Sequence, residues 1–481
     1  MLTRLKVRGF KNLADVEVRF GPFTCIAGAN GVGKSNLFDA VQFLRDLTEF
    51  SLVEAAARVR DPDGRSGDIQ GIFTKTPSGK PDPIFLEADF IVPRKVYDDF
   101  NREAIPTATY LAYALELRYV PANDNKPERL ELANESLNYI PASTARRRLG
   151  FAHKPVFRDS VIVNTRRAPY ISTENEDGKT TIKLHQDGGS SGRPFKVPAE
   201  SSPKTIVGGN NTNDYPTVLA ARREMQSWTL LQLEPSALRQ SDSYSAEPRV
   251  APNGAHLPAT LLRLDANSEI ADQLSELLDD VSEVQVDKDD SRRTLTLQVT
   301  CRNGIPHPAR ALSDGTLRFL ALAILAADPE AGRLLCLEEP ENGIHPSRIP
   351  AILSLIRHIV VDTELAVDPH NPLKQVIVNT HSPVVVSALS VDDLVVASPV
   401  RQGGALHAAF DCIDGSWRAK RETEADSPQT YVALATVLDY INTAPDETSR
   451  VQRISQRSSQ KTVRDYAKEQ INLPFAEEIP T

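Results

Sequence analysis

The stretch FTCIAGANGVGKS, residues 23–35, decides the fold. Its first part, Phe23 to Ala27, is an apolar run of strand length, and it leads into Gly28 to Ser35, which satisfies the pattern G-x-x-x-x-G-K-[ST]. From Ser35 to Phe50, apolar residues recur at three- and four-residue steps, as in a helix that packs on a sheet. This order of strand, loop and helix predicts a loop whose backbone N–H groups bind phosphate, with the helix N-terminus adding positive potential.

Each residue type in this loop has a chemical reason. The glycines let the backbone wind tightly, Lys34 is expected to reach the β and γ phosphates of ATP, and the Ser35 hydroxyl is expected to ligate Mg²⁺. The residues expected to bind the nucleotide are Asn30, Gly31, Val32, Gly33, Lys34, Ser35 and Asn36. The alternative is a glycine-rich turn that caps a helix and matches the pattern by chance. A strand before the loop and a helix after it make such a chance match less frequent.

A second informative segment, Leu334 to Pro340, is an apolar strand that ends in two adjacent carboxylates. Open α/β sheets bind their ligands at this end of their strands. Successive strand residues point to opposite faces, so Glu338 and Glu339 are expected to differ in role. One of the two would hold the Mg²⁺ water shell, and the other would orient or deprotonate the attacking water. The alternative is a solvated acidic turn before a proline.

A third apolar run, Gln375 to Asn379, is followed by Thr380, His381, Ser382 and Pro383. A histidine at the carboxyl edge of a sheet can donate to a γ-phosphate, which makes His381 a catalytic candidate. A lone histidine is more often structural, so this interpretation depends on its companions.

Composition excludes several classes of protein. The chain has 481 residues, 40% of them hydrophobic and 25% charged, with a formal net charge of −9 and four cysteines, none in a CxxC pair. Neither a disulfide framework nor a zinc site is suggested. The longest apolar run, Phe319 to Ala327, is too short to cross a bilayer, and we expect no membrane partner and a cytoplasmic protein.

The pattern along the chain predicts an α/β fold with a parallel central sheet, an antiparallel β lobe and a helical/β insertion. Short alternating segments begin near Pro81, helical patterning covers Tyr215 to Glu234, and strands alternate with helices from Ser313 to Asn379. The expected parts are the two pieces of an ATPase head, 1–90 and 301–415, an inserted β lobe and helical region, 91–300, and a C-terminal helical tail, 416–481.

Together these segments resemble the ABC-type ATPase superfamily, in the branch shared by RecF-like, SMC-like and OLD-like ATPases. Leu5 to Leu13 is similar to the family's first strand and turn, and Leu312 to Arg318, LSDGTLR, resembles the ABC signature. The order of motifs, namely Walker A, signature, Walker B and switch histidine, is that of the family. The resemblance implies a P-loop NTPase of ABC-ATPase head type that hydrolyses ATP with Mg²⁺.

The resemblance also implies roles for particular residues. Ser313 and Gly315 would contact the γ-phosphate held by an opposite subunit, so ATP would be sandwiched between the heads of a homodimer or a higher homo-oligomer. Glu338 and Glu339 match the Walker B pair, in which Glu338 would hold the metal and Glu339 would activate water. Glu341 to Pro346 matches the D-loop. His381 falls on the switch histidine, and Gln70 is the candidate for the Q-loop ligand of the metal. The sequence departs from the pattern in having Glu338 where the metal carboxylate is usually Asp, and LSDGTL in place of LSGGQ.

The branch follows from what the rest of the chain lacks. Asp411 and Asp414 do not form a Toprim-like carboxylate set, and 34 prolines argue against a long coiled coil. What remains resembles a stand-alone OLD/RecF-like ATPase encoded beside a separate effector, often a nuclease, in DNA-maintenance or anti-phage operons. The alternatives are an ATP-stabilised scaffold or DNA clamp with negligible turnover, and a P-loop kinase.

Basic clusters are the remaining candidate for a nucleic-acid interface. They comprise Arg146 to Arg148, Arg166 with Arg167, and the six basic residues between Arg450 and Lys468. Phosphates of duplex DNA are one interpretation, without sequence specificity because no aromatic residues interleave with the clusters. A solvated helix face or a protein interface is the other.

Overall fold

The computed structural model describes residues 1–59, 69–75, 81–123, 127–176, 179–188, 193–278, 281–402, 404–419 and 431–432. The expected tail, 416–481, and its basic segment from Arg450 to Lys468 therefore lie outside the described residues, apart from 416–419 and 431–432. Within the described part, no helix is both long enough and apolar enough to span a membrane.

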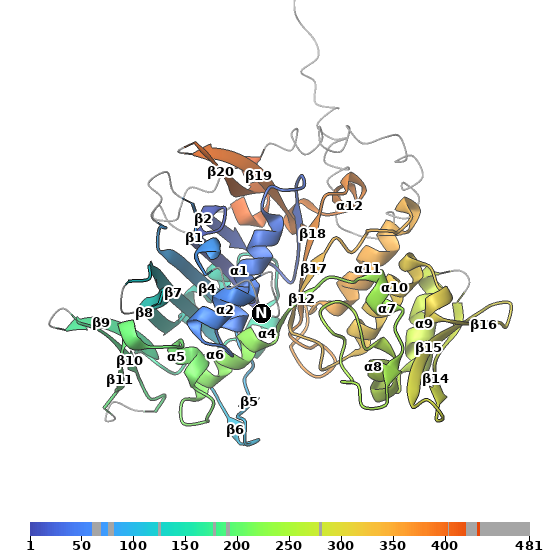
Figure 1. Cartoon of the computed structure of the whole chain (residues 1–481), viewed down its shortest axis with the longest axis horizontal. Coiled ribbons are helices and arrows are strands. Elements are labelled where there is room, and N and C mark those ends of the chain that lie inside the picture. The colour runs from blue at the N-terminus through green and yellow to red at the C-terminus, as the bar shows by residue number, and fades with distance from the viewer. Residues whose placement is uncertain are drawn as a thin grey trace, which may run out of the picture.

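The centre of the molecule is a seven-stranded, mostly parallel sheet (Figure 1). Its order is β12 (Trp228–Leu231), β17 (Leu334–Glu338), β18 (Gln375–Thr380), β3 (Phe23–Ala27), β19 (Leu394–Gln402), β20 (Ala405–Ile413) and β21 (Tyr431–Val432). The first five strands run parallel, and β20 is antiparallel to β19. The predicted α/β class is confirmed.

Both faces of this sheet are buried, which explains why its strands are continuous apolar runs. In β3, Ile26 belongs to one hydrophobic core, whereas Cys25 and Ala27 belong to the other. The register pairs Glu338 with Asn379 and Thr380 with Ala27, so the carboxyl ends of β17, β18 and β3 meet at one edge.

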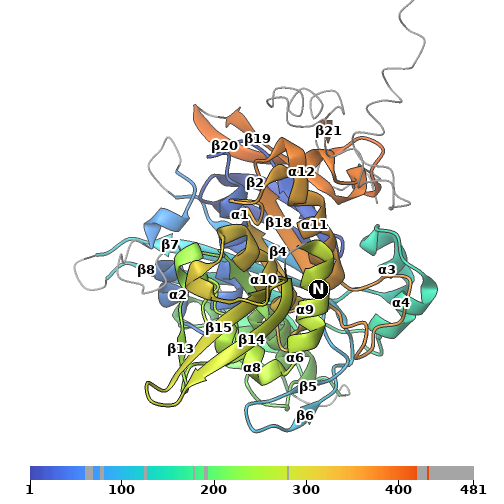
Figure 2. The ribbon, with the colours of Figure 1, turned by 90° about the vertical axis from the view of Figure 1, so that its right-hand side faces the viewer.

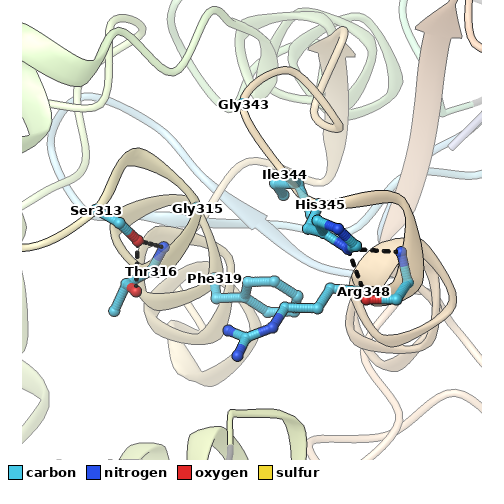
Figure 3. Close-up of a pocket in the computed structure, with 9 residues that line it drawn as sticks. Ser313, Gly315, Thr316, Phe319, Gly343, Ile344, His345 and Arg348 are labelled. Atoms are coloured by element: carbon cyan, nitrogen blue, oxygen red, sulfur yellow. Dashed lines mark hydrogen bonds between the residues drawn. The ribbon is translucent and has the colours of Figure 1, made fainter.

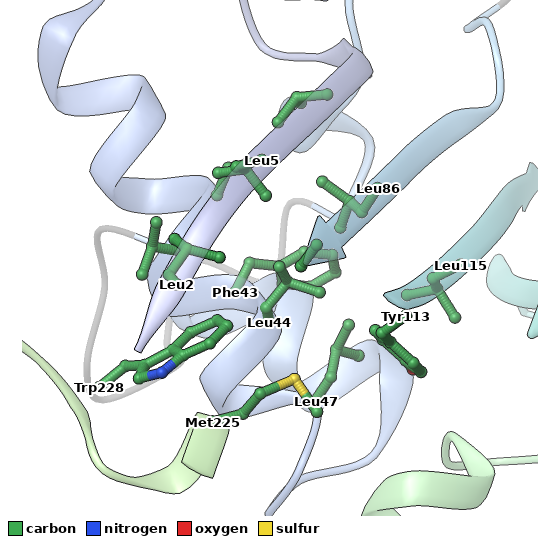
Figure 4. Close-up of a cluster of buried hydrophobic side chains, with 14 of the residues drawn as sticks. Leu2, Leu5, Phe43, Leu44, Leu47, Leu86, Tyr113, Leu115, Met225 and Trp228 are labelled. Atoms are coloured by element: carbon green, nitrogen blue, oxygen red, sulfur yellow. The ribbon is translucent and has the colours of Figure 1, made fainter. Parts of the chain in front are cut away.

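A second, eight-stranded antiparallel sheet covers one face. Its order is β11 (Phe195–Pro198), β10 (Lys179–Leu184), β9 (Ile171–Glu176), β8 (Arg129–Tyr139), β7 (Tyr110–Val120), β4 (Ile84–Ile91), β1 (Leu2–Phe10) and β2 (Leu13–Arg19). Helix α1 (Lys34–Asp46) packs on it, and Figure 4 shows Phe43 and Leu44 beside Leu2, Leu5 and Leu86. The phosphate-loop helix is thus anchored in the larger core.

The other face carries a lobe of helices and a small sheet, at the right of Figure 1 and toward the viewer in Figure 2. The helices are α7 (Pro235–Leu238), α8 (Leu257–Leu264), α9 (Asn267–Leu277), α10 (Asp314–Ala327) and α11 (Ile349–Ile359). The sheet contains β13 (Asp242–Ser243), β14 (Val281–Asp289), β15 (Thr294–Cys301) and β16 (Pro306–Pro308). Their apolar side chains share a core with the central strands.

The remaining elements are short. They are α2 (Leu52–Arg58), β5 (Val96–Tyr97), β6 (Glu103–Ala104), α3 (Ala142–Leu149), α4 (Pro155–Val161), α5 (Ile206–Gly209), α6 (Pro216–Gln226) and α12 (Pro383–Ser387). The 3₁₀ turns are Gln70–Ile72, Ala199–Ser201, Ala309–Ala311, Pro346–Arg348, Val391–Asp393 and Trp417–Ala419.

One predicted element is wrong in a way that matters for the site. The helix expected over Tyr215 to Glu234 ends at Gln226, and Trp228–Leu231 forms β12 beside the acid-bearing β17. Apolar side chains continue through both elements, so periodicity alone did not reveal the change from helix to strand. Consequently the segment after Leu231 emerges at the same sheet edge as Glu338.

Candidate functional site

The loop between β3 and α1 has the shape that its glycines require. Gly33 has φ 120°, and a Cβ there would lie 2.6 Å from side-chain atoms of Asn12. At Gly28 a Cβ would lie 2.5 Å from the carbonyl oxygen of Ala397. Both positions therefore exclude a side chain, the first also because of its conformation.

Asn12, on the turn between β1 and β2, stabilises this loop by hydrogen bonds. Its Nδ2 donates to the carbonyl oxygen of Val32 at 2.8 Å, and its Oδ1 accepts from Nδ2 of Asn36 at 2.7 Å. Asn36 thus supports the loop through Asn12, whereas Asn30 and Gly31 are exposed at its tip.

Lys34 begins α1 and lies across the loop. Its Nζ donates to the carbonyl oxygens of Gly28 at 2.7 Å and Ala29 at 2.9 Å. Burial lowers the pKa of Lys34 despite the opposing effect of three carboxylates, in decreasing order those of Glu339, Glu341 and Glu338. A cation held at the loop by weak carbonyl acceptors is available to phosphate oxygens.

The two adjacent acids diverge at the end of β17. Glu338 is the last strand residue, and its Oε2 accepts a hydrogen bond from Nε2 of Gln232. Glu339 lies beyond the strand with φ 45°, and its backbone N–H donates to Asn379 Oδ1 at 3.0 Å. A left-handed turn therefore separates the acids, and strand alternation does not reach Glu339.

Glu339 is fixed by two side chains. Its Oε1 lies 2.8 Å from Nδ1 of His381, and its Oε2 accepts from Nδ2 of Asn342 at 2.7 Å. Burial alone would raise the pKa of Glu339, but the hydrogen bonds from Asn342 and His381 outweigh it and hold the pKa below its usual value. Glu339 is thus an oriented carboxylate at neutral pH.

A cavity of about 330 Å³ lies between the start of α1 and the end of β17. Its lining residues are Ser35, Gln232, Leu233, Glu234, Pro235, Arg318, Glu338, Glu339, Asn342 and Asn379. Three of the predicted site residues, Ser35, Glu338 and Glu339, therefore share one cavity. Sequence reasoning missed Gln232, Arg318, Asn342 and Asn379.

Gln70, the predicted metal ligand, is exposed on the 3₁₀ turn Gln70–Ile72 and does not line this cavity. The glutamine that does so is Gln232, one residue after β12. Its signal would have been the strand Trp228–Leu231, which places the next residue level with Glu338 because Leu231 pairs with Leu337.

The donor set of the cavity suits a hard cation. Within the described part of the chain, no group of three or more His, Cys, Asp or Glu side chains could hold a metal ion. A hydroxyl and a carboxylate, from Ser35 and Glu338, match instead the sparse protein ligation of Mg²⁺, which takes its other ligands from phosphate and water. The residues present fit Mg²⁺ bound together with a nucleotide.

Ser313 and Gly315 lie elsewhere. They line a second hollow of about 430 Å³ together with Thr316, Phe319, Gly343, Ile344, His345, Ser347 and Arg348, and it shares no lining residue with the first (Figure 3). Ser313 caps α10, and its Oγ accepts from the backbone N–H of Thr316 at 3.2 Å. The signature residues are therefore not brought to the cavity of Ser35.

A family model described as "AAA domain, putative AbiEii toxin, Type IV TA system" matches residues 23–175 and 204–387, which is more than half of the chain. The chain belongs to this family. Short parts of this AAA domain are also similar in sequence to RecF proteins.

The AAA domain is similar to the DNA replication and repair protein RecF of Phocaeicola vulgatus, at 34% identity over 86 residues, 18% of this chain and 23% of that protein. It is also similar to RecF of Magnetococcus marinus, at 46% identity over 57 residues, 12% of this chain and 15% of the relative. The chain thus spans less than a quarter of the length of these relatives.

Among solved structures, an Smc head bound to the C-terminal winged-helix domain of ScpA aligns with a TM-score of 0.46 at 13% identity, covering 86% of this chain and 98% of the other. The SMC head domain from Thermotoga maritima aligns with a TM-score of 0.39 at 15% identity, covering 86% and 99%.

Proposed function

We propose that this AAA domain binds and hydrolyses MgATP and that two copies close on the nucleotide. One observation carries the proposal: Ser35, Glu338 and Glu339 line one cavity beside the phosphate loop, whereas Ser313 and Gly315 line another. Because the signature residues do not line the cavity of the same chain's nucleotide, they can contact a nucleotide only if it is bound by a second copy. Each copy would then supply the signature to the nucleotide of the other.

The residues of the phosphate loop and those in or next to the first cavity have separate tasks. Lys34 and the backbone N–H groups of residues 30–36 bind the phosphates, and Ser35 with Glu338 would hold Mg²⁺, which neutralises the charge that develops on them. Glu339 orients and deprotonates the attacking water, and His381, which holds Glu339 through Nδ1, would sense the γ-phosphate. Ser313 acts across the interface.

The test is steady-state ATP hydrolysis beside light-scattering mass in MgATP, for the wild type and Glu339→Gln. The exposed acid variant Glu330→Gln is the matched control. We expect turnover to fall at least about a hundredfold in Glu339→Gln, with a persistent ATP-bound dimer, and no change in the control. A dimer that forms in ATP but hydrolyses nothing, in the wild type as in the variant, would support the ATP-stabilised scaffold instead.

The wider role is also a proposal. Control of a separately encoded effector in DNA maintenance or anti-phage defence is supported by the toxin–antitoxin system that the family description names, and by RecF being a replication and repair protein. Duplex DNA, bound without sequence specificity, would be a further partner, and the cytoplasm the place of action. Adding duplex DNA to the hydrolysis assay tests that part directly.

The division of the chain follows from the same proposal. Residues 1–90 and 301–415 would form the ATPase head, 91–300 the inserted β lobe and helical region, and 416–481 a tail. Because β12 pairs with β17, the segment Trp228–Leu231 would function with the head despite its place in the insertion.

A further inference from the structure

Arg318 is a buried cation without a hydrogen-bond or ion-pair partner among the residues that the structure describes. It lies near the start of α10, its exposed fraction is 8%, and its Nε is buried without a hydrogen bond. Within the described part of the chain, its guanidinium makes no hydrogen bond or ion pair at all. A desolvated, unsatisfied charge is costly, so a fold that keeps one has a use for it in another state.

The side chain of Arg318 lines the cavity of Ser35, Glu338 and Glu339. It is the only cationic residue among those that line this cavity. Burial lowers the pKa of Arg318, against the opposing effect of Asp314, Glu341 and Glu339. The guanidinium thus interacts electrostatically with these carboxylates without a hydrogen bond to them.

The neighbouring carboxylates are engaged by other groups. Glu339 holds His381 and Asn342, and Asp314 is paired with Arg239. Glu341 is buried and accepts from the hydroxyl of Thr380 through Oε1, although its Oε2 has no partner. None of these three carboxylates is hydrogen-bonded to Arg318.

The ligand that fits an arginine in this setting is an oxyanion. The guanidinium presents five donors in a planar fork that matches phosphate oxygens, and charge-assisted bonds of this kind are strengthened by desolvation. The other polar lining groups are carboxylates, amides and one hydroxyl, which suit a metal ion and water better than phosphate.

We propose that Arg318 binds the terminal phosphate of the nucleotide held by Lys34 and Ser35 of the same chain. This inference rests on the proposed function. Since Ser313 caps the helix that carries Arg318, binding at Arg318 also fixes the position of the second hollow relative to the chain's own nucleotide. The occupied site thereby prepares the surface that a second copy must meet.

The experiment measures affinities of the full chain for ADP and for the non-hydrolysable analogue AMP-PNP, both with Mg²⁺, by calorimetry. The variants are Arg318→Met, Arg318→Lys and the control Arg310→Met, which removes an exposed arginine from the same lobe. Arg318→Met is expected to lose about ten- to a hundredfold in AMP-PNP affinity and less than about twofold for ADP. Arg318→Lys is expected to recover part of the loss, and Arg310→Met to lose nothing.

Thermal unfolding gives a second readout. Without nucleotide, Arg318→Met is expected to melt at a higher temperature than the wild type, because the variant no longer buries an unpaired charge. An unchanged preference for AMP-PNP over ADP in Arg318→Met would overturn the inference and leave the proposed function standing. Equal losses for both nucleotides with a lower melting temperature would identify a structural arginine and overturn it as well. A wild-type chain that binds neither nucleotide would overturn both.

Discussion

The guanidinium of Arg239 pairs with the carboxylate of Asp314 and also donates to the carbonyl oxygen of Leu312 at 3.2 Å. Asp314 occupies one of the two positions, with Thr316, at which LSDGTL departs from LSGGQ. Arg239 follows α7, which begins at Pro235, the last of the cavity residues Gln232 to Pro235. The signature turn is thus tied to the segment that reaches Glu338.

This pair predicts a variant that impairs turnover without impairing binding. Arg239→Ala should leave the ATP affinity unchanged and lower kcat about tenfold. Arg239 holds the two neighbours of Ser313, and in the proposed dimer Ser313 contacts only the nucleotide of the second copy. Global stability should change by less than about 1 kcal/mol, since the pair is partly exposed. A double-mutant cycle with Asp314→Asn measures the coupling, and additive effects on kcat would contradict the relationship.

Mixing two inactive chains tests the exchange of signatures. Lys34→Ala and Ser313→Arg should each be inactive alone, while an equal mixture should regain about a quarter of wild-type turnover, because half of the dimers are mixed and each mixed dimer has one intact site. Mixing Lys34→Ala with Lys34→Met is the control. A mixture no more active than its components would argue against a shared site.

The two glutamines give a direct comparison. Gln232→Ala should lower kcat about tenfold and raise the Mg²⁺ concentration needed for half-maximal turnover. The reason is that the substitution removes the hydrogen bond that orients Glu338. Gln70→Ala should have no effect, since Gln70 is exposed outside the cavity. Hydrolysis rates across a Mg²⁺ titration measure both, and the reverse order of effects would restore Gln70 as the metal ligand.

Glu135 on β8 predicts a pH dependence of stability. It is fully buried, accepts from the backbone N–H groups of Ile206 and Val207 at 2.6 and 3.0 Å, and burial raises its pKa to about 7. The folded state therefore keeps a proton that the unfolded state releases near pH 4.5. The free energy of unfolding should fall as the pH rises from 4.5 to 7, by up to about 3 kcal/mol. Glu135→Gln should flatten this slope in denaturant titrations, and an identical slope in the variant would contradict the assignment.

The sequence predicted those site residues that lie close together in one motif or one strand. Lys34 and Ser35 belong to the phosphate-loop motif itself, and Glu338 ends a strand that its apolar run makes recognisable. Gln232 and Arg318 could not be found in this way, because their roles arise from the pairing of β12 with β17 and from the depth of α10 in the lobe. Asn12 likewise supports the phosphate loop across a sheet contact that no spacing rule encodes.

The place of β18 has a consequence for synthesis of the chain. Strand β18 lies between β3 and β17, yet it is made last of the three, from Gln375–Thr380. During translation the phosphate loop and the Glu338 strand are both complete before the strand that joins them has left the ribosome. A nascent chain that has not yet reached Gln375 therefore cannot pair the strands that assemble this cavity, and it also lacks Asn379, which holds the backbone of Glu339. The proposed ATP turnover would therefore require synthesis of the chain to have passed Thr380.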